Sequence, residues 1–84
     1  MTVYETISHC TIRLWCEAMH YWPACPAGES DRVRIGGNPF AEPEELEYLD
    51  WEDWFKVFEA RQFKFVYNPS DGWCDIQPRH VKPD

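Results

Sequence analysis

The feature that most constrains this chain is a pair of strand-like segments separated by a short turn. Residues 63–67 alternate strictly, with aromatic side chains at 63, 65 and 67 and with Lys64 and Val66 between them. Residues 68–72 (Asn-Pro-Ser-Asp-Gly) have the composition of a hairpin loop. In the returning segment, residues 73–77, Cys74 and Ile76 share one face. This pattern predicts an antiparallel β-hairpin.

A helix with a well-marked start precedes the hairpin. Asp50 is the expected N-cap, and Asp53 occupies the third helical position of a near capping box. Leu49, just before the cap, is expected to pack on Trp54 as a hydrophobic staple. The aromatic residues at 51, 54, 55 and 58 follow a 3.6-residue period, so we expect this face in the core.

The first half of the chain predicts a helix followed by extended segments. Residues 6–22 suit a helix that begins at Thr6 and is stopped by Pro23. Its main apolar face is expected at positions 7, 11, 14, 15, 18 and 22, widened by 12, 16 and 19. Two prolines in residues 23–28 argue against a central strand there and favour an edge or a connector. Residues 32–35 predict a short strand, which a turn at residues 36–39 ends.

These elements predict an α+β protein. We expect two helices on one face of a short antiparallel sheet of three or four strands, in the order α-β-β-α-β-β. Residues 1–84 are expected to form a single domain, because so short a chain has little room for a second core, and residues 78–84 a frayed tail. No apolar segment is long enough to span a bilayer and the N-terminus lacks a signal pattern, so we expect no membrane contact and a cytoplasmic location.

The negative charge is concentrated in one segment. The net charge is −7, and seven of the 15 acids lie between Glu42 and Asp53 with no Lys or Arg among them. The other eight acids are balanced by the eight bases of the chain. Because phosphate binding needs a basic surface, this composition argues against direct contact with nucleic acid. Closely spaced carboxylates instead favour encounter with a basic groove.

We therefore expect a non-enzymatic acidic protein that binds a basic macromolecular partner. Aromatic side chains near the acids are common anchors at interfaces. The expected contact residues are Glu42, Glu44, Glu45, Glu47, Glu52, Asp53, Tyr48 and Trp73. One such partner is a nucleic-acid-binding complex, which an acidic chain can inhibit by imitating phosphates, as some small phage anti-CRISPR proteins do. In the alternative interpretation, the acids only aid solubility and cap a helix, and the chain is a housekeeping protein without an acidic-face function.

A zinc-stabilised structural module is a rival hypothesis. Cys16 and His20 are four residues apart on the expected helix, and Cys25 together with either Cys74 or His80 would complete a tetrahedral set. The absence of a Cys-x-x-Cys pair instead favours free, mostly buried thiols and no bound metal or cofactor. No nucleophile elbow, phosphate loop or dinucleotide fingerprint occurs, so no catalytic residues are expected.

Two further features leave alternatives open. A polar stripe on the first helix, formed by His9, Arg13 and Glu17, is either a recognition surface or an ordinary solvated face. The many aromatic residues on so short a chain would favour a homodimer if they leave an exposed apolar patch.

A longer pattern covers most of the chain. It comprises His9-x-Thr-Ile-Arg-x-Trp-x-Glu17, then Pro23-Ala24, Arg34-Ile35 and Leu46-Glu47, then Trp51–Phe55, Phe58-Glu59, Phe65 and Tyr67. In these residues the chain resembles a family of small bacterial proteins of similar length and uncharacterised function. Such proteins are often labelled glucan branching enzymes, but that activity needs a large barrel with several catalytic carboxylates, which 84 residues cannot form. The resemblance therefore implies a small bacterial protein without an assigned activity.

Overall fold

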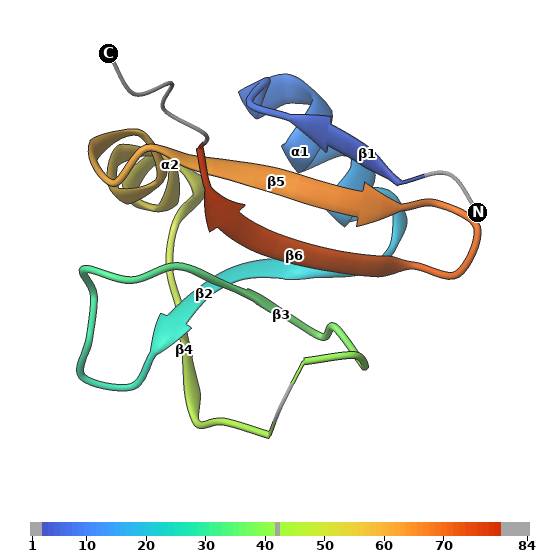
Figure 1. Ribbon diagram of the computed structural model, residues 1–84. Coiled ribbons are helices and arrows are strands. Elements are labelled where there is room, and N and C mark those ends of the chain that lie inside the picture. The colour runs from blue at the N-terminus through green and yellow to red at the C-terminus, as the bar shows by residue number, and fades with distance from the viewer. Residues whose placement is uncertain (1–2, 42, 80–84) are drawn as a thin grey trace, which may run out of the picture.

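A computed structural model describes residues 3–41 and 43–79, and it confirms the α+β class (Figure 1). The elements are β1 (Tyr4–Thr6), α1 (His9–Ala18), β2 (Trp22–Pro26), β3 (Arg34–Gly36), β4 (Leu46–Tyr48), α2 (Trp51–Ala60), β5 (Phe63–Asn68) and β6 (Trp73–Pro78). The sequence predicts one sheet, whereas the strands within the described residues form two antiparallel sheets ordered β1-β5-β6 and β3-β2-β4. The strands β1 and β4 were not predicted: Thr6 was assigned to the first helix, and residues 46–48 were read as part of an acidic loop.

The predicted hairpin is confirmed as β5 and β6, which pair from Phe63 opposite Pro78 to Asn68 opposite Trp73. Tyr67 lies opposite Cys74, so these two side chains share a face of the sheet. On the other edge of β5, β1 adds a third strand in which Tyr4 pairs with Tyr67. The hairpin is thus the framework of the first sheet.

The expectation that residues 23–28 avoid a central strand is wrong, because β2 is the middle strand of the second sheet. Its neighbours are staggered: β3 pairs with residues 22–24 and β4 with residues 24–26, so only Ala24 is paired on both sides. The Pro23 carbonyl accepts a hydrogen bond from the N–H of Leu49, the residue just past the end of β4. The backbone polar groups of Pro23 therefore point to the β4 side of β2, at a position beyond the residues of β4 that pair with β2. Pro26 faces the opposite side, beyond the end of β3. Each proline therefore places its missing donor where no ladder partner is needed.

Helix α1 is shorter than the expected span of residues 6–22. Ser8 is the N-cap, and its hydroxyl accepts from the Thr11 N–H at 3.3 Å. At the other end, His20 adopts a left-handed conformation with φ of 63°. The Tyr21 N–H bonds the Cys16 carbonyl at 2.8 Å and the His20 N–H bonds the Glu17 carbonyl at 3.1 Å, which is a Schellman motif. The helix therefore ends at Ala18, four residues before Trp22, where the expected helix ended.

The buried face of α1 also differs from the expected one. Ile12 and Cys16 are fully buried, and Trp15 packs with ring centroids 5.7 Å from Phe65 and 5.1 Å from Tyr67. Leu14, expected in the core, is instead 62% exposed. Positions 12 and 16, which were expected only to widen the apolar face, thus form its centre, because α1 rests on the aromatic side of β5.

Helix α2 follows the prediction closely. It spans Trp51–Ala60 with Asp50 at the N-cap, although the Asp50 side chain makes no capping hydrogen bond. Trp54 and Phe58 are fully buried and stack at 5.2 Å. The Trp54 indole N–H donates to the Arg34 carbonyl at 2.9 Å, which ties α2 to β3. Together with Ile12, Cys16, Tyr21, Val33, Ile35, Phe65 and Cys74, these two aromatic residues form one core shared by both helices and both sheets.

The start of the predicted frayed tail is held in place. Pro78 is the last residue of β6. The Arg79 guanidinium donates to the Phe63 carbonyl at 2.9 Å and to the Glu59 carboxylate at 3.1 Å, and it lies 5.6 Å above the Phe58 ring. Residues 80–84, the rest of that tail, lie outside the described residues. Within residues 3–41 and 43–79, neither helix has the length and apolarity needed to cross a bilayer.

Candidate functional site

The predicted acidic contact residues lie on one continuous part of the chain that runs into α2. We call residues 44–53 the acidic segment. It comprises the end of the β3–β4 loop, edge strand β4, and the first turn of α2. All predicted contact residues within it are solvent-exposed: Glu44, Glu45, Glu47, Tyr48, Glu52 and Asp53. Glu42, also predicted, lies outside the described residues.

The carboxylates of the acidic segment differ in how far they are neutralised. Glu44 pairs with Arg34 at 3.0 Å, and Glu52 and Asp53 both approach the Lys56 ammonium at 3.8 Å. Among the described residues, no Lys or Arg lies within 4 Å of the three remaining acids, which are Glu45, Glu47 and Asp50. Since exposed pairs at such distances are weak, the segment keeps most of its negative charge.

Tyr48 and Trp73, the two predicted aromatic anchors, have different surroundings. Tyr48 is 66% exposed on β4, between Glu47 and the start of α2. Trp73 lies at the start of β6 in the other sheet and is half-buried. There it lines the mouth of a cleft together with Phe40 and Glu44. Tyr48 therefore remains a candidate anchor for the acidic segment, whereas Trp73 belongs to the cleft.

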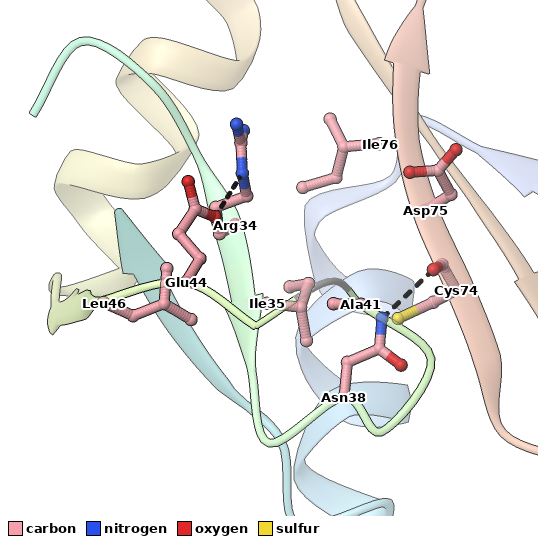
Figure 2. A pocket seen from close by; sticks show the side chains of 9 residues that line it. All are labelled: Arg34, Ile35, Asn38, Ala41, Glu44, Leu46, Cys74, Asp75 and Ile76. Carbon is pink, nitrogen blue, oxygen red and sulfur yellow. Dashed lines mark hydrogen bonds and ion pairs between the residues drawn. The ribbon is translucent and has the colours of Figure 1, made fainter. Parts of the chain in front are cut away.

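This cleft lies between the two sheets. Its inner part is a hollow of about 120 Å³, and a wider mouth of about 490 Å³ opens from it. Figure 2 shows one wall formed by β3 and the β3–β4 loop, and the other formed by β6. The inner hollow is lined by Arg34, Ile35, Asn38, Ala41, Glu44, Leu46, Cys74, Asp75 and Ile76. Sequence reasoning missed it because its walls come from segments about thirty residues apart, and no local pattern predicts that they meet.

The residues of the zinc hypothesis lie in different surroundings, and His80, the alternative fourth ligand, lies outside the described residues. Cys16, Cys25 and Cys74 are buried free thiols, and Cys10 is exposed. Burial raises the pKa of all three buried thiols, in the case of Cys74 to about 12. His20 is exposed and ends α1. In the described parts of the chain, no three His, Cys, Asp or Glu residues are placed to share a metal ion.

The polar stripe of α1 is split between two environments. His9 stacks on Phe55 of α2 with ring centroids 4.1 Å apart, and its ring nitrogen bonds Glu59 at 3.0 Å. That bond, followed by the bond from Arg79, lowers the pKa of Glu59. Arg13 and Glu17 remain solvated and pair with each other at 3.5 Å. His9 therefore connects the two helices, and the rest of the stripe is an exposed ion pair.

Comparison with known proteins identifies no relative: no family model, curated protein or solved structure matches the chain. The resemblance to small bacterial proteins stays a prediction.

Proposed function

We propose that this chain is a non-enzymatic binding protein whose acidic segment contacts a basic macromolecular partner. The observation that carries the proposal is the exposed, unneutralised state of Glu45, Glu47 and Asp50 at the junction of β4 and α2. A structure that needed these carboxylates internally would pair them or bond them to backbone N–H groups. Asp50, in particular, makes no capping bond despite its N-cap position.

The position of the segment suits an encounter with a positively charged surface. Exposed like charges raise the local negative potential, and such a potential speeds association with a basic partner. Tyr48 adds a large amphipathic side chain beside the charges, of the kind that often anchors an interface. A cytoplasmic nucleic-acid-binding protein presents the expected surface, and covering its phosphate-binding groove would inhibit it.

The test is a capture experiment with two variants of equal charge. The first carries Glu45→Gln, Glu47→Gln and Glu52→Gln in the acidic segment. The control removes the same number of exposed acids elsewhere, through Glu17→Gln, Glu29→Gln and Asp31→Asn. Partners from a bacterial lysate are captured on each immobilised protein at low and at high salt, identified by mass spectrometry, and then purified for affinity measurement.

The proposal requires a basic partner that binds the native and control proteins but binds the acidic-segment variant at least tenfold more weakly. Binding must also weaken with salt, because exposed charges are screened. Equal losses in the two variants would show that only net charge matters, and unchanged binding by the acidic-segment variant would exclude the segment as the contact surface.

A further inference from the structure

Strand β4 is an edge strand of the second sheet and pairs with β2 alone (Figure 1). The Leu49 N–H donates to the Pro23 carbonyl at 3.1 Å, and the Glu45 carbonyl accepts at 3.0 Å from the residue that follows β2. Successive residues of an antiparallel ladder turn their backbone groups alternately toward and away from the neighbouring strand. Leu46 and Tyr48 therefore turn their N–H and C=O groups away from β2. Within the described residues, these outward groups form no hydrogen bond.

The outward groups of two other strands are partly covered by the fold itself. On β6, the Cys74 carbonyl accepts from the Asn38 side-chain amide at 3.2 Å, as Figure 2 shows, and Pro78 ends the strand without a donor. Beside β3, the Val33 carbonyl accepts from the Arg34 guanidinium at 2.9 Å. The edge of β4, in contrast, offers both donors and acceptors, which is the arrangement that pairs with an additional strand.

The side chains of the acidic segment determine which strand this edge can accept. Glu45 and Glu47 are exposed and lie on one face of β4, whereas Leu46 and Tyr48 lie on the other face. If two copies of this chain paired through the outward groups of Leu46 and Tyr48, their Glu47 side chains would lie directly opposite each other. Like charges in that position are destabilising, whereas a Lys or Arg there is stabilising. The charges of the edge therefore disfavour a second copy and favour a basic strand.

From these observations we propose that β4 receives an extended basic segment of a partner protein as an additional antiparallel strand. Lys or Arg side chains of that segment lie beside Glu45 and Glu47, and apolar side chains alternate with them beside Leu46 and Tyr48. Tyr48, which is 66% exposed, then packs on the apolar face of the added strand. This inference rests on the proposed function, and it adds that backbone hydrogen bonds as well as charge hold the partner.

The experiment uses the peptide acetyl-Lys-Val-Lys-Val-Lys-amide and two N-methylated isomers of it. In the proposed register, the two valines use their N–H groups to bond Leu46 and Tyr48, and the lysine N–H groups point away from β4. One isomer is methylated on both valine nitrogens and the other on the nitrogens of the second and third lysines, so charge and composition are equal. Each peptide is titrated at low salt into the isotope-labelled full chain, and amide NMR shifts are followed.

For so short a peptide we expect a Kd on the order of 1 mM, with saturable shifts centred on residues 45–49. The valine-methylated isomer should bind at least fivefold more weakly than the lysine-methylated isomer, because it loses two hydrogen bonds to the edge. Equal binding of the two isomers, a reversed order, shifts centred elsewhere, or no saturable binding by the unmodified peptide would overturn the added strand.

Two variants test the same bonds from the side of the protein. Tyr48→Pro and Tyr48→Ala both remove the ring, but only proline also removes the outward N–H. Because that N–H does not bond β2, both variants should fold, which thermal unfolding checks. The unmodified peptide should bind the proline variant at least threefold more weakly than the alanine variant. If the proline variant does not fold, the comparison of the two isomers on the native chain decides.

The acidic-segment variant with Gln at positions 45, 47 and 52 separates this inference from the proposed function. Weaker binding by that variant, together with equal binding of the two isomers, would leave the charge contact intact and refute only the added strand. Unchanged affinity of that variant for the unmodified peptide would refute the charge contact, and with it both proposals.

Discussion

Tyr21 provides the sharpest test of how the two halves of this fold are joined. It is the third residue after α1, is only 9% exposed, and donates its hydroxyl hydrogen to the Gly72 carbonyl at 2.8 Å. Gly72 is buried in the turn between β5 and β6 and adopts a φ of +85°. One buried hydrogen bond therefore links the segment that follows α1 to the turn between β5 and β6. The substitution Tyr21→Phe removes this bond and leaves the ring in place.

The expected cost follows from the chemistry of a single lost donor. The ring of Tyr21 stays packed against Trp15, 5.7 Å away, so no cavity is created. A buried hydrogen bond contributes about 0.5–1.5 kcal/mol, and an acceptor left unsatisfied can cost about 1–3 kcal/mol. We expect the free energy of unfolding to fall by about 1–2 kcal/mol. In a domain of this size, that corresponds to a decrease in Tm of roughly 4–15 °C.

Urea unfolding followed by tryptophan fluorescence measures this change directly. The midpoint should decrease while the m-value stays constant, because the surface exposed on unfolding is nearly unchanged. Tyr48→Phe is the matched control, since it removes the same hydroxyl from a side chain that is 66% exposed. The control should change stability by less than about 0.5 kcal/mol. If Tyr21→Phe were no more destabilising than Tyr48→Phe, the proposed link between α1 and the hairpin would be refuted.

Three further predictions concern ionisation and helix ends. Because burial raises the native pKa values of Cys16 and Cys74, these thiols contribute stability below their unfolded pKa near 9.0 that is lost as pH rises further. Above that pH, the free energy of unfolding measured by urea titration under reducing conditions should fall by about 1.4 kcal/mol per pH unit for each thiol, and Cys74→Ala should flatten the slope. The pKa of Glu59 is lowered, so its contribution is present above its unfolded pKa near 4.5 and lost as pH falls; Glu59→Gln should make acid unfolding, followed by circular dichroism, less steep. His20→Gly should raise stability by about 0.5 kcal/mol in thermal unfolding, because glycine relieves the left-handed conformation, whereas Glu17→Gly inside α1 should lower it by about 1 kcal/mol.

The elements predicted correctly are those specified by neighbouring residues. The start of α2 at Asp50 and the pairing of β5 with β6 follow from signals a few residues apart. Where α1 ends could not be predicted in this way, because His20 occupies a position at which glycine is the usual signal. The sequence instead contains Pro23, which stops any helix but does not require the helix to reach it.

The buried face of α1 shows a second limit of local patterns. Leu14 and Ile12 both belong to apolar stripes with helical spacing, and the sequence alone favours the longer stripe, which contains Leu14. Which face of α1 is buried depends on residues distant in the sequence, since Ile12 and Trp15 pack in the core that contains Phe65 of β5. Leu14 then lies on the exposed side. Similarly, the prolines of β2 are tolerated because β3 and β4 end at different points along it, a stagger that no local sequence signal contains.

Of the candidate sites, exposure of the acidic segment was predictable because six acids without a base among them cannot all be buried. Which of these acids form ion pairs could not be predicted from the sequence, as Glu44 illustrates. Its neighbours Glu45 and Glu47 lie free on the surface, whereas Glu44 pairs with Arg34 at the edge of the cleft. Since Arg34 is itself held between Glu44 and the Val33 carbonyl, that pair shapes the cleft and offers little net charge to a partner. Contact with a basic surface is therefore assigned to Glu45, Glu47 and the start of α2, whereas Glu44 is held by Arg34 at the edge of the cleft.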